Sequence, residues 1–284
     1  MVGSIAVARQ LEAKGCEFVL GGVAWERLPV DPLPGPRPLA ELRGAEPLGK
    51  HAALARPDSP VTTQTGARFS ESHVAEFLGR PTVLIDVTGG ARGAADGLTR
   101  AATELDCDTT VLVDIGGDAI ALGGETGLAS PLCDAVMIAA APKGSVLSIL
   151  GAGCDGELRP AEVLERIATL ARAGASLGAD GVTPAQADEI EAAAQSAFTE
   201  ASMGVARCAR GEFGVVPIRA GRRTVELGPA GAISFLFDLD RALPELPLAE
   251  VVAGSTSIEG GRRALEAIGV RTELDFELER AGRE

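Results

Sequence analysis

The sequence contains few aromatic residues and almost no histidine. None of its 284 residues is tyrosine, one is tryptophan and two are histidine. Catalytic triads and most zinc sites use histidine, so both are disfavoured here. The five cysteines are scattered without a Cys-x-x-Cys spacing, which argues against a zinc ribbon and a disulfide framework. The core must therefore be built from aliphatic side chains.

Long apolar runs and excess positive charge are also missing. No apolar run approaches the ~20 residues that a membrane-crossing helix needs. The net charge of −14 repels nucleic acid and anionic lipid, which excludes both as expected partners. With 46% hydrophobic and 23% charged residues, the composition is that of a folded globular protein. We expect a cytoplasmic protein and, by default, a homodimer.

The first part of the sequence alternates helical patterns with short β-branched runs. Parallel strands joined by helices produce this alternation. We predict strands over 16–20, 82–87, 109–115 and 145–150, and helices over 1–14, 71–79, 93–105, 131–141 and 160–173. Ser70 is a candidate N-cap, and the proline-rich segment 24–65 is expected to be irregular.

The second part of the sequence has a different texture. A helix is predicted over 184–201, capped by Thr183 and continuing toward Arg210. Strands over 213–219, 223–227 and 232–237 are too close for crossovers, which predicts an antiparallel hairpin with an added strand. A last helix over 258–268 precedes a polar tail.

These patterns predict an α/β fold with a doubly wound, mostly parallel, Rossmann-like sheet and helices on both faces. We expect one domain over 1–284, with a parallel βαβ core in 1–175 and a helical and antiparallel β extension in 176–284. The sequence starts within its first helical pattern, so the first strand of such a sheet is expected to be missing.

Glycine-rich loops follow four of the predicted strands. The carboxyl ends of parallel strands share one edge, where ligands bind, and glycine lets backbone N–H groups approach an anion. No loop matches a Walker or dinucleotide-binding fingerprint. Ser130 is read as a helix N-cap rather than a nucleophile, but it is kept as a candidate substrate-binding residue with the glycines Gly89, Gly90, Gly116, Gly117, Gly151, Gly153 and Gly156.

Carboxylates recur at the same strand ends. Asp114, Asp118, Glu125 and Asp155 are the candidate acid/base residues, and Glu157 is a candidate substrate-binding residue. Clustered acids repel one another unless a cation, an arginine or a shared proton compensates. This pattern predicts a Mg²⁺ site, with Asp114 and Asp118 as its candidate ligands, or a general acid/base pair. The alternative is that Asp155 or Glu157 caps the helix over 160–173.

A rigid proline-rich loop carries further candidates. Arg27 and Arg37 suit a carboxylate or phosphate, and Trp25 and Asp31 are grouped with them as substrate-binding residues. Ion pairs of these arginines with Glu26 or Asp31 are the structural alternative. Trp25 is expected to fill the core or to offer a stacking platform.

Several motifs together resemble the family described as domain of unknown function 1152. They are Trp25-Glu26-Arg27, Asp31-Pro32, Pro34-Gly35-Pro36-Arg37, Asp114 to Asp118 with Glu125, Ser130-Pro131-Leu132-Cys133-Asp134, and Gly151 to Glu157. The resemblance covers nearly the whole chain and implies no activity. Members of that family begin with a strand and a glycine run before the first helix. Met1 and Val2 stand about where this run would end.

The stretch between Asp114 and Glu125 is also similar to a motif of the D-glutamate cyclase family. That similarity implies acid/base chemistry on a small carboxylate, with Arg27 or Arg37 holding the substrate. Our leading hypothesis is an enzyme acting on a small phosphate- or carboxylate-bearing metabolite with help from Mg²⁺. The alternatives are a metal-independent lyase or cyclase and a non-catalytic protein for metabolite binding or assembly.

Overall fold

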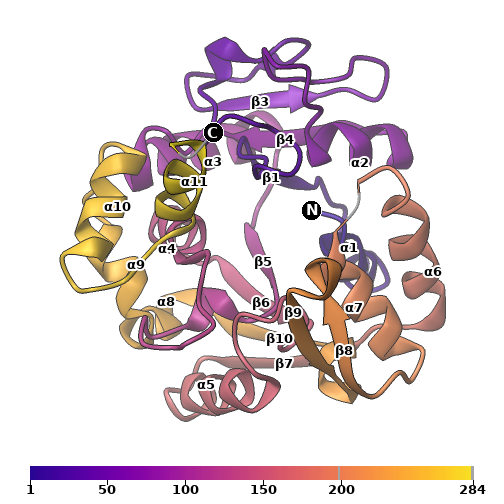
Figure 1. The fold of residues 1–284 in the computed structure, drawn as a ribbon. Helices are drawn as coiled ribbons and strands as arrows, with labels where there is room; N and C mark the ends of the chain where they lie inside the picture. The colour runs from indigo at the N-terminus through magenta and orange to yellow at the C-terminus, as the bar shows by residue number, and fades with distance from the viewer. Residues whose placement is uncertain (198, 283–284) are drawn as a thin grey trace.

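The computed structural model describes residues 1–197 and 199–282. Its strands form two four-stranded sheets, in the orders β1-β4-β3-β2 and β5-β6-β10-β7, and a separate hairpin, β8-β9 (Figure 1). The strands are β1 (Gly21–Val23), β2 (Glu46–Pro47), β3 (Ala52–Ala55), β4 (Thr82–Ile85), β5 (Val111–Ile115), β6 (Val146–Leu150), β7 (Ser176–Gly181), β8 (Gly214–Ile218), β9 (Arg223–Leu227) and β10 (Ile233–Asp238).

Helices cover both sheets. They are α1 (Ser4–Glu12), α2 (Ser70–Leu78), α3 (Gly90–Glu104), α4 (Pro131–Ala140), α5 (Pro160–Arg172), α6 (Pro184–Ala193), α7 (Glu200–Ala209), α8 (Leu239–Ala242), α9 (Pro247–Val252), α10 (Ile258–Glu266) and α11 (Glu273–Ala281). The C-terminal helices α9, α10 and α11, drawn in yellow, pack beside α4, whereas α6 packs against α1 and α7 (Figure 1). Among the described residues, no helix has both the length and the apolar character that crossing a membrane would require.

The core lies on both faces of the central strands. On β6, Leu147 and Ile149 belong to the largest buried cluster, whereas Leu150 joins a second cluster with Ile5 of α1 and Ile190 of α6. Successive side chains of a strand point to opposite faces, so this division means that helices pack against β6 from two sides. The structure therefore confirms an α/β fold with helices on both faces.

The predicted doubly wound, mostly parallel sheet is not confirmed. Within the described chain, only β1 with β4 and β5 with β6 pair in parallel, and the other strand pairs are antiparallel. Two features break the expected pattern. Strands β1 and β5 are edge strands of different sheets, and β10 from late in the sequence lies between β6 and β7. The fold is a mixed α/β arrangement of open sheets.

Several predicted elements shift or divide. The first strand is β1 rather than residues 16–20, because Gly21–Val23 find their partner in Val83–Ile85. The helix predicted from residue 184 ends at Ala193, and α7 begins at Glu200 and folds back onto α6, so packing overrides a continuous helical pattern. Thr183 caps α6 as predicted, but the N-cap position of α2 is Phe69 rather than Ser70.

The hairpin β8-β9 is confirmed, but the third nearby strand, β10, pairs with β6 and β7 instead. The segment expected to be irregular carries the buried strand β3, and the expected polar tail forms α11. Strand β7 was missed because Ser176–Gly181 has no β-branched residue. The single domain over 1–284 stays a prediction.

Candidate functional site

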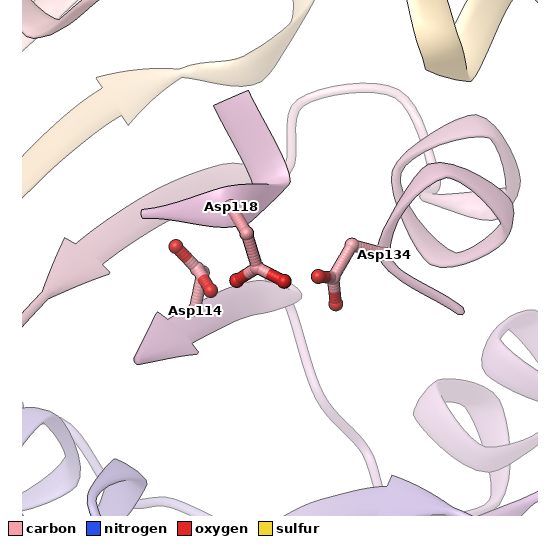
Figure 2. Close-up of side chains that lie close together, drawn as sticks. All are labelled: Asp114, Asp118 and Asp134. Atoms are coloured by element: carbon pink, nitrogen blue, oxygen red, sulfur yellow. The ribbon is translucent and has the colours of Figure 1, made fainter. Parts of the chain in front are cut away.

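Five carboxylates gather where β5 and β6 end. Asp114 lies near the end of β5, Asp118 begins the short 3₁₀ helix after it, and Asp134 lies in the first turn of α4. Asp155 and Glu157 follow β6. Figure 2 shows that the carboxylates of Asp114, Asp118 and Asp134 lie close together. One oxygen from each of these three lies within 4.8 Å of the others, and the same holds for Asp118, Asp155 and Glu157.

The sheet register and two glycines bring these acids together. Because β5 and β6 pair in parallel, with Ile115 opposite Leu150, both strands end at the same edge. Gly116 and Gly117 have φ angles of 137° and 108°, which side chains rarely adopt. A Cβ on Gly116 would overlap the carboxylate of Asp155. Glycine at this position therefore lets the loop after β5 approach Asp155.

Burial dominates the electrostatics of the cluster. Asp114, Asp118 and Asp155 are at most 9% exposed. Burial, followed by the charge of Asp134, raises the pKa of Asp114 and of Asp118 well above its usual value. Burial and then Glu157 raise the pKa of Asp155 to about 6, and burial and then Glu273 raise that of Asp134 to about 7. Without added positive charge, the cluster keeps protons near neutral pH.

Only part of the cluster is satisfied by hydrogen bonds. Glu157 Oε2 accepts from the backbone N–H groups of Ala129 (2.7 Å) and Ser130 (2.8 Å), and Ser130 Oγ donates to Glu157 Oε1 (2.7 Å). Asp155 Oδ1 accepts from the backbone N–H of Glu157. In contrast, Asp114 Oδ2 and Asp155 Oδ2 are buried and have no hydrogen-bond partner among the described residues. Buried polar atoms nearly always have a hydrogen-bond partner, so these two unpartnered oxygens require an explanation.

This arrangement differs from the capping roles considered for the sequence. Ser130 occupies the N-cap position of α4, but its side chain makes no cap hydrogen bond and contacts the acids instead. Neither Asp155 nor Glu157 caps α5, because Arg159 is the N-cap residue there and pairs with Glu162. Neither acid is therefore engaged at the start of α5.

Arg27 lies in a second charged group next to α4. Its guanidinium stacks over the ring of Trp25, 4.3 Å from the centroid, and Nη2 lies 3.3 Å from Glu273 Oε1. The two carboxylate oxygens of Glu273 accept the backbone N–H groups of Leu132 and Cys133, at the start of α4. Burial is the largest single influence and lowers the pKa of Arg27, but the neighbouring acidic groups together, Glu273 foremost, raise it further than burial lowers it, so Arg27 keeps its charge.

Trp25 combines both roles expected of it. It is 7% exposed within the main core, and its Nε1 donates to Glu277 Oε2 (3.1 Å) while its ring supports Arg27. Glu273 and Glu277 were missed because they belong to the expected polar tail. The spacing of Thr272 and Asp275, which form a capping box at the start of α11, is the sequence signal that marks this helix.

A cavity of about 420 Å³ lies beside β1 and β5 and reaches Asp114 and Asp134 of the carboxylate cluster. Apolar residues of the two strands line one part, and Trp25, Glu26, Asp114 and Asp134 line the other. Small-molecule sites commonly have volumes of ~300–1,000 Å³ and place a few polar groups in an apolar lining. The cavity therefore has the size and chemistry of a metabolite site.

In the proline-rich loop, Arg37 forms an ion pair with Asp31, which was the alternative to substrate binding. Arg37 Nε lies 2.7 Å from Asp31 Oδ2, and its other nitrogens bond the carbonyls of Leu33 and Pro34. Asp31 is 1% exposed. This ion pair holds the loop, and Arg37 is committed within it. Arg27 pairs with Glu273 and Glu277 rather than with Glu26.

Other candidates have structural surroundings. Glu125 accepts the backbone N–H groups of Leu122 and Gly123, so it holds its own loop. Gly90 packs against Ser255 and Ser257, next to α10, and Gly89 packs against His51. The remaining glycines shape the loop after β6 through close contacts with other elements: Gly151 with Val205, Gly153 with Pro160, and Gly156 with Val225.

The comparison with protein families identifies the family of this chain but not its activity. The model of the family described as protein of unknown function DUF1152 matches residues 1–281. The chain belongs to this family. No curated protein and no solved structure matches it. For this DUF1152 member, the resemblance to D-glutamate cyclase stays a prediction, and function has to be argued from the carboxylate cluster.

Proposed function

We propose that this DUF1152 protein is an enzyme that acts on a small anionic metabolite with a divalent cation, Mg²⁺ above all. The observation that carries the proposal is the pair of buried, unpartnered oxygens, Asp114 Oδ2 and Asp155 Oδ2, within a carboxylate cluster. Leaving such oxygens without partners is costly. Mg²⁺ prefers oxygen ligands, so it supplies the missing charge and contacts. Its proposed ligands are the acids that converge on Asp118, which are Asp114 and Asp134 in one group and Asp155 and Glu157 in the other.

The remaining groups suit an anionic substrate. Arg27 Nη1 is buried without a hydrogen bond, and Glu273 joins Arg27 to the first turn of α4. An arginine held in this way binds phosphate or carboxylate. A bound divalent cation polarises an oxygen of such a group.

A metal-independent lyase or cyclase is the second candidate. It is favoured by the raised pKa values of Asp134 and Asp155, at about 7 and about 6, which suit carboxyl groups that share protons. Against it, the described arginines contact the cluster only at Arg219, whose Nη2 lies 3.6 Å from Glu157 Oε1. For either enzyme, the five free cysteines are consistent with work in a reducing compartment such as the cytoplasm.

Thermal melting with added ligands tests the proposal. A ligand at ~100 times its dissociation constant stabilises the folded state by about 2.7 kcal/mol. We expect Mg²⁺ or Mn²⁺ to raise the melting temperature by several degrees, and phosphate- or carboxylate-bearing metabolites to raise it further. Asp118→Asn, which removes the carboxylate common to both groups, should lose most of the cation response, whereas the exposed control Asp188→Asn should keep it. If neither cation changes the melting temperature, the second candidate replaces the first. A response to cations without turnover of any phosphate or carboxylate ester would favour a binding protein.

A further inference from the structure

The carboxylate cluster contains two overlapping sets of ligands. Asp114, Asp118 and Asp134 form the first set, and Asp118, Asp155 and Glu157 form the second. Oxygens within each set lie within 4.8 Å of one another. Asp118 is common to both sets, and a carboxylate can offer one oxygen to each of two ions.

Each set has its own unsatisfied oxygen. Asp114 Oδ2 belongs to a residue of the first set and Asp155 Oδ2 to a residue of the second. Both residues are 9% exposed, so water cannot freely solvate either oxygen. The other oxygen of Asp155 already accepts the N–H of Glu157, which leaves Oδ2 as its available ligand. A single cation bound in one set would leave the unpartnered oxygen of the other set without a metal contact.

The charge of the cluster also favours two bound cations over one. When ionised, the five carboxylates carry five negative charges, and Arg219 at 3.6 Å from Glu157 offsets one of them. Arg27 is already paired with Glu273 and Glu277. Two divalent cations would offset the remaining four charges, whereas one would leave a net charge of −2 in a buried site.

We propose that the cluster binds two divalent cations side by side, with Asp118 as the bridging ligand. Asp114 and Asp134 complete one site, and Asp155 and Glu157 complete the other. Paired cations about 3.5–4 Å apart suit the oxygens of a phosphate group. The inference rests on the proposed function and narrows its substrate class to phosphate-bearing metabolites, with Arg27 on the α4 side of the cluster.

The first test counts bound Mn²⁺ on the full chain by equilibrium dialysis at pH 8 and records its low-temperature electron paramagnetic resonance spectrum. We expect two Mn²⁺ per chain and the spectrum of an exchange-coupled pair. One Mn²⁺ per chain, or two with uncoupled spectra, overturns the paired site but leaves the proposed cation-dependent function intact. No bound Mn²⁺ overturns both.

Variants separate the two sites. Asp134→Asn and Glu157→Gln should each lower the count from two to one and remove the coupling, whereas Asp118→Asn should remove the coupling and weaken both ions. Asp188→Asn, on the exposed face of α6, is the matched control and should keep two coupled ions. Circular dichroism verifies that each variant is folded. A folded Asp118→Asn variant that keeps the coupled spectrum contradicts the bridging role.

Inorganic phosphate tests the substrate class. With phosphate present, we expect Mn²⁺ to bind at least tenfold more tightly to the wild-type protein, because the anion contacts both ions. Asp134→Asn should lose most of this gain. Unchanged Mn²⁺ affinity in phosphate, with acetate as the comparison anion, overturns the phosphate assignment while the count of two ions stands.

Discussion

Replacing Asp134 by asparagine should make the metal-free protein more stable at alkaline pH. Burial, followed by the charge of Glu273, raises the pKa of Asp134 from its ordinary value of 3.8 to about 7 in the folded state. The folded protein therefore holds this proton more tightly than the unfolded chain. Stability is lost as the pH rises from about 4, and the loss is complete above pH 7.

The size of the effect follows from the two pKa values. A pKa difference of one unit corresponds to 1.36 kcal/mol, so the ionised Asp134 costs about 4 kcal/mol at pH 8 and about 2 kcal/mol at pH 5. Asparagine is neutral at every pH and avoids this cost. Relative to wild type, the variant should gain about 2 kcal/mol between pH 5 and pH 8.

Urea unfolding in the presence of a chelator measures this difference at both pH values. Adding Mg²⁺ at pH 8 should then raise the unfolding free energy of the wild type more than that of Asp134→Asn, because the cation binds the ionised carboxylate. Parallel stability curves for wild type and Asp134→Asn between pH 5 and pH 8 would refute the electrostatic reasoning. A gain that is equally large at pH 5 would point to packing instead.

Three further substitutions test the fold around the site. Arg27→Gln leaves the buried Glu273 without its charged partner and should cost about 2 kcal/mol in urea unfolding, below the ~3–5 kcal/mol of a fully buried pair because the Arg27 side chain is 38% exposed. Gly116→Ala should lower both the unfolding free energy, by at least ~2 kcal/mol, and the affinity for Mg²⁺, since φ is 137° and a Cβ would overlap a neighbouring carboxylate. Phe237→Ala empties a fully buried position and should cost ~3–5 kcal/mol by the same assay.

Matched positions control two of these changes. Gly144 also has a positive φ, of 81°, but nothing lies within 4 Å of an added Cβ, so Gly144→Ala isolates backbone strain from overlap. Phe213 is 78% exposed, and Phe213→Ala should change stability by less than ~0.5 kcal/mol. Equal effects at Gly116 and Gly144 would mean that the close approach of the loops is unimportant. For Arg27→Gln, an unchanged unfolding free energy would mean that Glu273 is satisfied by the backbone alone.

Local sequence patterns correctly predicted the elements whose structure depends mainly on their own residues. The helices over 93–105, 131–141 and 160–173 and the strand over 145–150 agree with α3, α4, α5 and β6 within a few residues. The hairpin was also predictable, since the turn at Gly221 leaves no room for a crossover. In each case, the hydrophobic period and the flanking turn residues agree with the final packing.

Strand pairing between distant segments could not be predicted in this way. Nothing local in Ile233–Asp238 distinguishes a strand that joins the hairpin from one that lies between β6 and β7. The site shows the same limit. Asp114, Asp118 and Asp155 were predicted because strand ends share an edge, whereas Asp134 and Glu273 reach the site from helices whose placement depends on tertiary packing.

The contact between Arg27 and Glu273 joins positions that are 246 residues apart in the sequence. Glu273 lies on α11, so Arg27 and the first turn of α4 acquire this partner only after the chain has been synthesised as far as α11. Earlier folding intermediates would lack this connection. If the proposed cations bind the completed fold and not the unfolded chain, they would stabilise the folded state, and the metal concentration would help to set the amount of folded protein.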